Sequence, residues 1–176
     1  YYSGYVQVHQ KGYWDEQILD NSFEIDEKLI TAIRKNTSIN EIVPRLETFV
    51  LASNENTTKG CLLVGTDPVK ENNLTQLKNK LIKGSYFENN EEVVIIAEGL
   101  AKRLNLSVND TIVLFGQGFH DVMAAGKYKI KGIVHLASPG MNDAFVYLPL
   151  ATTQYFLSAD NRLTSISLGI DDPNNT

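Results

Sequence analysis

The segment 93–114 has the sequence VVIIAEGLAKRLNLSVNDTIVL and constrains the fold more than any other part of the chain. Its first residues, 93–96, are consecutive apolar and mostly β-branched, which is typical of a short strand buried on both faces. A two-turn helix is then predicted by apolar residues at helical spacing, which are Ala97, Leu100, Ala101 and Leu104. Turn-forming residues at 107–110 separate this helix from a second strand at 111–114. The segment therefore predicts a strand, helix, turn and strand, and it contains no catalytic pattern.

The composition indicates a folded domain and argues against nucleic-acid binding. The chain has 176 residues, of which 43% are hydrophobic and 21% charged, as in ordinary globular domains. Its net charge is -5, whereas nucleic-acid binding requires a stripe of basic residues. No apolar stretch approaches the roughly 20 residues of a membrane span. Both ends are polar and turn-like, and we expect the chain to have been excised from a longer protein.

The two ends of the chain each predict a β-α-β unit. The first unit comprises a strand at 5–9, a helix at 27–35 and a long strand at 39–52. Asp26 is a suitable N-cap for that helix, and Pro44 indicates an edge or a bulge in the long strand. The last unit comprises a strand at 144–148, a helix from Pro149 to 157 and an alternating strand at 163–170.

The middle third differs in character. Leu74, Leu77 and Leu81 predict a helix that ends at Gly84. A loop is expected after residue 114, beginning at Gly116, and strands follow around 127–136. We therefore predict an α+β fold in which the two terminal units pair into one sheet with helices on one face, and the middle third forms an inserted β-rich lobe.

No residue set predicts catalysis, cofactor binding or a metal site. His9, His120 and His135 have no second ligand at metal-binding spacing. Gly116 and Gly118 resemble the start of a dinucleotide loop but lack the third glycine and precede strands. The single cysteine, Cys61, lies in an apolar strand-like run and is interpreted as a buried structural thiol. We expect neither a cofactor nor enzymatic activity in this domain.

Several short motifs, in order along nearly the whole chain, resemble the extracytoplasmic core domain of the MacB/LolC/FtsX-type ABC transporter permeases. They are Tyr5–His9, Ile42–Arg45, Val64–Pro68, Ile82–Gly84, Ile96–Leu104, Val108–Asp110, Tyr128–Val134 and Ala144–Leu150. Asn109 is a departure, since the family commonly has glycine before the aspartate. Asparagine tolerates a positive φ better than most residues, so the turn is expected to be kept.

The resemblance implies a domain between the first and second transmembrane helices of a permease, in the periplasm or extracytoplasmic space at the inner (cell) membrane. It implies a porter-like α+β subdomain with an inserted β-rich subdomain called Sabre, which we place at 1–66 with 141–176 and at 67–140, respectively. It further implies that a cytoplasmic ATPase, separate or fused, drives the permease and that this domain transmits the motion to a substrate or partner.

The partners implied by the resemblance are the permease's own transmembrane helices and the ATPase, with a periplasmic adaptor, a lipoprotein carrier or a second permease copy in a dimer as further possibilities. No nucleic-acid partner is expected. Partner contacts are predicted in two loops, because loops host contacts more often than strands, and the residues chosen are Gly116, Gln117, Phe119, His120, Met141 and Asn142. It is equally open that these loops are only flexible connectors. The alternative to the favoured permease domain is a secreted soluble α+β ligand-binding domain or enzyme that is not linked to a transporter.

Overall fold

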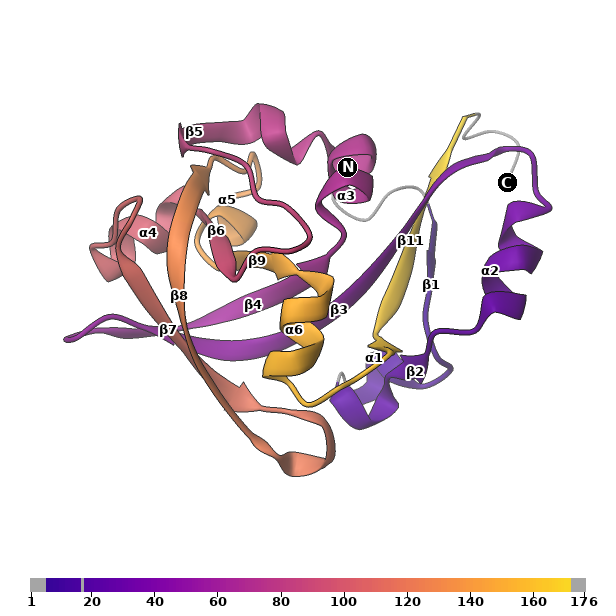
Figure 1. The fold of residues 1–176 in the computed structure, drawn as a ribbon, viewed down its shortest axis with the longest axis horizontal. Coiled ribbons are helices and arrows are strands. Elements are labelled where there is room, and N and C mark those ends of the chain that lie inside the picture. The colour runs from indigo at the N-terminus through magenta and orange to yellow at the C-terminus, as the bar shows by residue number, and fades with distance from the viewer. Residues whose placement is uncertain (1–5, 17, 172–176) are drawn as a thin grey trace.

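The computed structural model describes residues 6–16 and 18–171 of the chain. Within this part, nine strands form one sheet with the order β1-β11-β3-β4-β9-β6-β8-β5, and β7 pairs with both β3 and β8. A separate pair is formed by β2 (Phe23–Glu24) and β10 (Arg162–Leu163). Few and short helices accompany this large sheet (Figure 1). The predicted α+β class is confirmed.

A closed barrel is the centre of the molecule. Its strands pair in the cyclic order β3-β4-β9-β6-β8-β7 and back to β3, with parallel pairing only between β4 and β9 and between β6 and β8. Full closure removes the free edges that an open sheet exposes. The barrel strands are β3 (Ile39–Ser53), β4 (Thr58–Thr66), β6 (Val93–Ala97), β7 (Thr111–Gln117), β8 (Met123–Val134) and β9 (Phe145–Pro149).

The barrel interior is filled by alternate residues of its strands and completed by two helices. Inward positions include Leu46 and Val50 of β3 and Ile112 of β7, all buried. The helices are α4 (Glu98–Leu104) and α6 (Leu150–Phe156), whose apolar side chains belong to the same core. A Cβ on Gly65 of β4 would lie 2.5 Å from the Thr153 side chain, so only glycine lets α6 pack this closely on the barrel.

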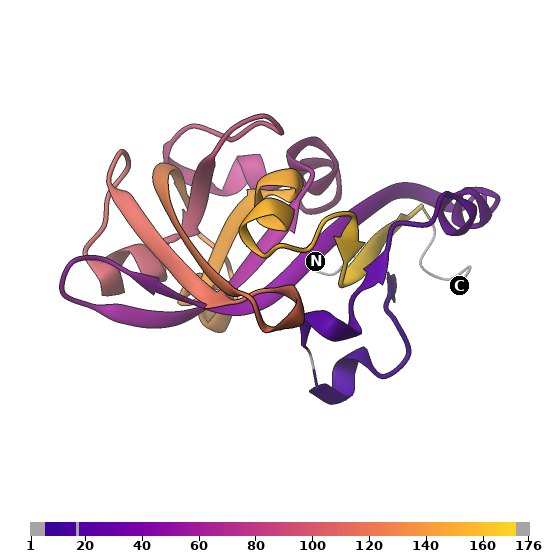
Figure 2. The same cartoon turned by 60° about the horizontal axis from the view of Figure 1, so that its bottom comes forward.

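A smaller sheet shares β3 with the barrel. Residues 39–45 of β3 pair with β11 (Ser165–Ile170), and β11 pairs with β1 (Val6–Val8). The helix α2 (Glu27–Arg34) covers this sheet with an apolar stripe of Leu29, Ile30 and Ile33. The small sheet with α2 lies at one end of β3 and the barrel at the other, as Figure 2 shows. Thus one strand runs through both parts of the molecule.

The remaining elements cover the outer surface. The side chains of Val64, Ile95 and Tyr147 point out of the barrel and pack against residues 77–87, which fold over it. The short elements are α1 (Tyr13–Glu16), α3 (Pro68–Thr75), β5 (Leu81–Gly84), α5 (Pro139–Asn142) and the 3-10 helices η1 (Leu19–Asn21), η2 (Leu77–Lys80) and η3 (Phe119–Asp121). Among residues 6–16 and 18–171, no helix has the length and apolar character needed to cross a bilayer.

Most predicted elements are present, and the helix predicted through Leu74, Leu77 and Leu81 is wrong. The chain there forms α3, η2 and β5 instead. Asp67 caps α3 by accepting hydrogen bonds from the backbone N–H groups of residues 69 and 70, and Gln76 ends it at a left-handed φ of 54°. Leu81 already pairs with Val134 of β8. The three leucines lie in successive short elements, not on one helical face, and only Leu77 is fully buried.

The subdomain limits at 1–66, 67–140 and 141–176 stay a prediction. Strand pairing crosses these limits twice, because β7 pairs with β3 and β6 pairs with β9. Pro44 pairs with Ile166 of β11, and the pairing of β3 with β4 begins one residue later, at Arg45. The β3–β4 pairing therefore does not need the N–H that proline lacks. Asn109 has a φ of 74°, as expected for the turn before β7.

The junction between the small sheet and the barrel contains a fully buried ion pair. Arg45 pairs with Ser165 of β11 on one side and with Thr66 of β4 on the other. Its Nε and Nη2 atoms donate to the two carboxylate oxygens of Glu71 in α3, at 2.9 and 2.8 Å. Thr66 and Thr75 donate to the same carboxylate at 2.9 and 3.0 Å, and both side chains of the ion pair have no exposed surface. The carboxylate thus has the hydrogen bonds that a buried charge needs.

Replacing Glu71 by glutamine should destabilise the whole fold. The variant leaves the Arg45 guanidinium buried without its counter-charge, and we expect the free energy of unfolding to fall by about 3–5 kcal/mol in urea denaturation. An Arg45→Met/Glu71→Leu double variant should recover more than half of that loss, because no charge remains buried. As a control, Lys131→Met removes a partly exposed pair with Glu91 and should cost about 0–1 kcal/mol. A Glu71→Gln loss as small as that of the control would contradict this role of the ion pair.

Candidate functional site

Four of the predicted contact residues lie at the end of β7 and in its connection to β8, which is tighter than expected. Gly116 and Gln117 are not in a loop, because they continue β7 and pair with Ala124 and Met123 of β8. Phe119 and His120 lie in η3, so only residues 118–122 connect the strands. The predicted loop at 116–126 is therefore wrong, because residues 116–117 and 123–126 are paired strand residues of β7 and β8. Gly116 sits against Val50, where a Cβ would lie at 3.1 Å.

Backbone hydrogen bonds fix the conformation of this turn. His120 and Asp121 both have left-handed φ angles, of 55° and 59°. Gly118 donates to the carbonyl of Val122 at 2.7 Å, and Phe119 donates to the carbonyl of Leu157 after α6 at 2.8 Å. A Cβ on Gly118 would lie 2.4 Å from that same Leu157 oxygen. The turn is consequently anchored to the barrel and is not a free loop.

The N-terminal segment packs on the turn through Arg162. The Arg162 guanidinium lies 4.2 Å from the centre of the Phe119 ring, and its Nε donates to Ser22 Oγ at 2.6 Å. The backbone N–H of His120 donates to Asp20 Oδ1 at 3.1 Å. These contacts bring η1 and η3 together, although 100 residues separate Asp20 from His120. Sequence patterns give no signal for such a contact.

The other two predicted residues lie at the opposite end of β8, in α5. Met141 packs with the outer apolar cluster that includes Phe145 and Tyr147. Asn142 accepts a hydrogen bond from the backbone N–H of Leu136 at 2.9 Å. The structure thus does not bring α5 and the β7–β8 turn together, as Figure 1 shows. Partner contact at any of the six residues stays a prediction.

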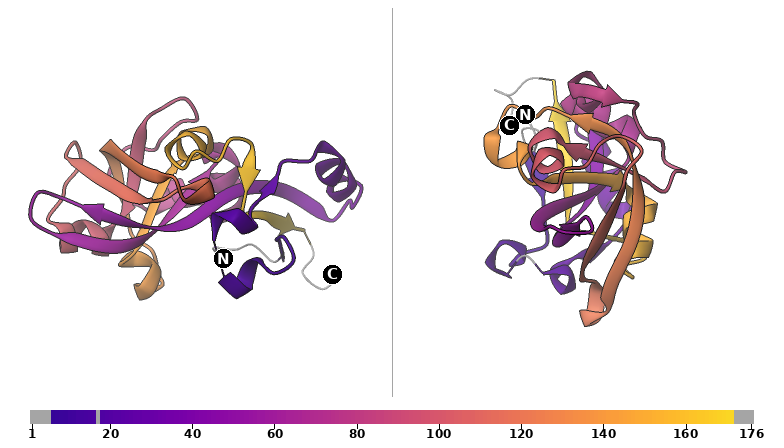
Figure 3. Two further views of the ribbon diagram at one scale, coloured as in Figure 1. Left: turned by 90° about the horizontal axis from the view of Figure 1, so that it is seen from below. Right: turned by 90° about the vertical axis from the view of Figure 1, so that its left-hand side faces the viewer.

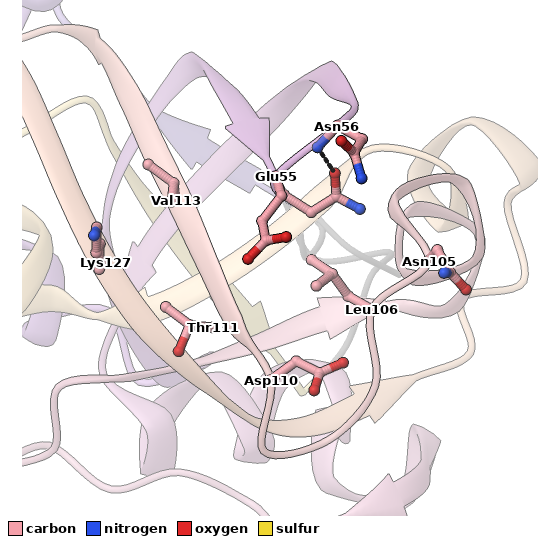
Figure 4. A pocket seen from close by; sticks show the side chains of 9 residues that line it. Glu55, Asn56, Asn105, Leu106, Asp110, Thr111, Val113 and Lys127 are labelled. Carbon is pink, nitrogen blue, oxygen red and sulfur yellow. Dashed lines mark hydrogen bonds between the residues drawn. The ribbon is translucent and has the colours of Figure 1, made fainter.

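A polar cavity of about 520 Å³ lies between the β3–β4 hairpin and the turn that follows α4 (Figure 4). Its lining residues are Asn54, Glu55, Asn56, Asn105, Leu106, Asp110, Thr111, Val113 and Lys127. Asn54 Oδ1 accepts from the backbone N–H groups of Asn56 and Thr57 at 2.9 and 2.7 Å, and Asp110 accepts from that of Ser107 at 2.7 Å. These polar groups hold the two turns, and the lining contains neither histidine nor cysteine. Asn54 and Asp110 thus have a structural role in these turns.

The titratable groups elsewhere have structural environments. Cys61 is buried inside the barrel, as predicted, and burial raises the pKa of its thiol to about 12, far from the range of a reactive cysteine. A hydrogen bond from Lys102, followed by a smaller effect of the hydrogen bond with His135, lowers the pKa of the partly buried Glu98 carboxyl. His9 contacts the Thr164 carbonyl oxygen and stacks on Tyr13. Across the described ranges, no three potential ligand side chains lie close enough together to hold a metal ion.

Replacing Arg162 by glutamine should loosen the contact between η1 and the β7–β8 turn. The variant removes both the ring contact and the hydrogen bonds to Ser22, so we expect the free energy of unfolding to fall by about 1–3 kcal/mol. Glu24→Gln is the matched control, because Glu24 is exposed and its oxygen lies 3.9 Å from Arg162 Nη1. Chemical denaturation of both variants checks this, and equal losses would contradict the assignment.

The fold is similar to that of two transporter domains of known structure. One is the extracellular domain of the noncanonic ABC-type transporter YknZ from Gram-positive bacteria, with a TM-score of 0.64 and 15% identity over 88% of this chain and 76% of that chain. The other is the periplasmic region of MacB from Actinobacillus actinomycetemcomitans, with a TM-score of 0.64 and 16% identity over 94% of this chain and 73% of that chain. None of the curated proteins matches the sequence.

A family model gives the assignment that these distant structures cannot give by themselves. The model of the MacB-like periplasmic core domain matches residues 3–176, which is nearly the whole chain. This confirms the resemblance inferred from the ordered motifs. The family consists of periplasmic domains of transporter permeases and is not a known catalytic family. The chain therefore belongs to the MacB-like periplasmic core domains, the periplasmic or extracellular domains of ABC transporter permeases.

Proposed function

We propose that this domain transmits ATP-driven motion of the permease's membrane helices to a substrate or a partner protein outside the membrane. The family membership supplies the transporter context. The output is efflux of a substrate or release of lipoproteins, and the energy comes from a cytoplasmic ATPase that is separate from or fused to the permease. The domain itself contributes neither a cofactor nor a catalytic group.

The observation that carries the proposal is the path of β3. A domain that transmits force has to move as one body, because an internal hinge would absorb the displacement. The small sheet and the barrel share β3 without a break, and the Arg45–Glu71 ion pair is buried at the point where the partners of β3 change. Side-chain packing and strand pairing thus oppose bending at this junction.

The mechanism requires that the domain keeps its internal geometry while it changes position. Lys35 at the end of α2 and Glu55 in the β3–β4 hairpin are both exposed and lie at opposite ends of β3. Cysteines placed there can be spin-labelled without labelling Cys61, because its thiol is buried. The permease, with its ATPase, is reconstituted in lipid nanodiscs for pulsed electron paramagnetic resonance.

We expect the 35–55 distance within one domain to be the same without nucleotide and with ATP. The distance between Glu55 labels on two permease copies in one assembly should change when ATP binds. An ATPase variant that cannot bind ATP serves as the control and should abolish that change. A nucleotide-dependent change of the 35–55 distance would contradict rigid transmission, and an ATP-independent distance between copies would contradict transmission itself.

A further inference from the structure

Apolar side chains lie side by side on the outer face of the barrel, where β3, β7 and β8 are adjacent. Phe49 and Leu51 of β3 are 67% and 44% exposed. Leu51 pairs with Phe115 of β7, and Gln117, two residues on, pairs with Met123 of β8, which is 84% exposed. Ile18 and Val122 are exposed nearby, in the N-terminal segment and the β7–β8 turn. We call Ile18, Phe49, Leu51, Phe115, Val122 and Met123 the apolar face.

This apolar face is unusual for the outside of a barrel. The outward positions of β8 farther from the turn are lysines, at 127 and 129, as expected for a solvated strand face. In the view from below, β3 crosses the front of the molecule and no helix covers the half that leads to the β3–β4 hairpin (Figure 3, left). An apolar surface of this kind on a folded domain marks a site of interaction with another molecule.

A groove with two carboxylates adjoins Phe49. Its volume is about 220 Å³, and its lining includes Ile18, Phe49, Gln117 and the carboxylates of Asp20 and Asp121. Asp20 accepts a hydrogen bond from the backbone N–H of His120, and Asp121 accepts one from the Gln117 side chain. Both donors are neutral, and none of the ion pairs between described residues includes Asp20 or Asp121. The groove therefore presents two carboxylates that form no ion pair with another described residue, beside an apolar surface.

The groove is also preformed. Its two walls are η1 and the β7–β8 turn, which the Arg162 contacts with Ser22 and Phe119 hold together. A rigid site loses little conformational freedom on binding, so more of the contact energy contributes to affinity. Rigid walls also fix the distance between the apolar face and the carboxylates, which sets the spacing that a ligand must match.

We propose that the apolar face and its groove bind a segment of a partner protein that presents apolar side chains beside a lysine or arginine. The apolar side chains would cover Phe49, Leu51 and Met123, and the cation would enter the groove between Asp20 and Asp121. A second copy of this chain fits less well, because it brings the same two carboxylates and a net charge of -5. The inference adds the chemistry of the partner to the proposed function and rests on it only for the existence of such a partner.

The test uses nuclear magnetic resonance on the ¹⁵N-labelled 176-residue chain. The probe is a synthetic peptide of alternating leucine and lysine, and matched peptides carry glutamate or serine in place of every lysine. We expect the leucine–lysine peptide to shift the amide signals of residues 18–21, 47–51 and 115–123 at low salt, with affinity falling as salt is added. The glutamate peptide should produce no such shifts, and the serine peptide should bind about tenfold more weakly.

Matched variants separate the site from general attraction to an acidic protein. Asp20→Asn/Asp121→Asn and Phe49→Ser should each weaken binding about tenfold. Glu55→Gln/Glu88→Gln is the control for charge, because it removes the same charge from exposed positions elsewhere. Val69→Ser is the control for the apolar side chain, because Val69 is 64% exposed and Phe49 is 67% exposed. Both control variants should bind within about twofold of the unchanged chain.

Several results would overturn the proposal. These are no shifts with any peptide, shifts spread over the whole acidic surface, or equal losses for the control variants. Light scattering that shows a dimer dissociated by Phe49→Ser would assign the face to a second copy instead. The outcome is independent of the label distances in the intact permease. If those distances show transmission while no peptide binds, only the docking inference fails. If peptides bind while the label distances show no motion, only the proposed function fails.

Discussion

The buried Arg45–Glu71 ion pair is the constraint on which the arrangement of this domain depends. It lies where β3 passes from the small sheet into the barrel, with β11 on one side and β4 on the other. Two charges can be buried there only because Thr66 and Thr75 complete the hydrogen bonds of the carboxylate. The pair therefore fixes α3 against both sheets, and it requires all these elements to be in place together. For a domain of a transporter permease, the result is a rigid connection between its two ends.

Local sequence patterns predicted the segments in which one period persists. Residues 93–114 form the predicted strand, helix, turn and strand, and Asp26 caps α2 through its hydrogen bond to the backbone of Lys28. The pattern failed at residues 74–84, because the three leucines there belong to three short elements, of which only η2 buries its leucine fully. Barrel closure could not be predicted at all. It depends on the pairing of Leu51 with Phe115, and alternation within a strand does not reveal its partner.

The candidate surfaces were predicted only in part. The chain segment around Phe119 and His120 does adjoin the apolar face, but it was chosen as a loop and is an anchored turn. Phe49 and Leu51 were interpreted only as part of a long strand, since the sequence does not show which face of that strand is covered. Asp20 comes to this surface from a segment 100 residues away from His120. Long-range packing thus determines the surface, whereas the ordered motifs were sufficient for the family.

Native-state hydrogen exchange along β3 tests most directly whether the small sheet and the barrel form one body. The amides of residues 41–43 and 45, which pair with β11, and of residues 46–50, which pair with β4, are followed in increasing low concentrations of urea. If the two parts are one cooperative unit, both sets exchange through the same global opening, with equal free energies and equal urea dependence. A separate opening of residues 41–45 at lower free energy, with the barrel amides still protected, would contradict a rigid junction.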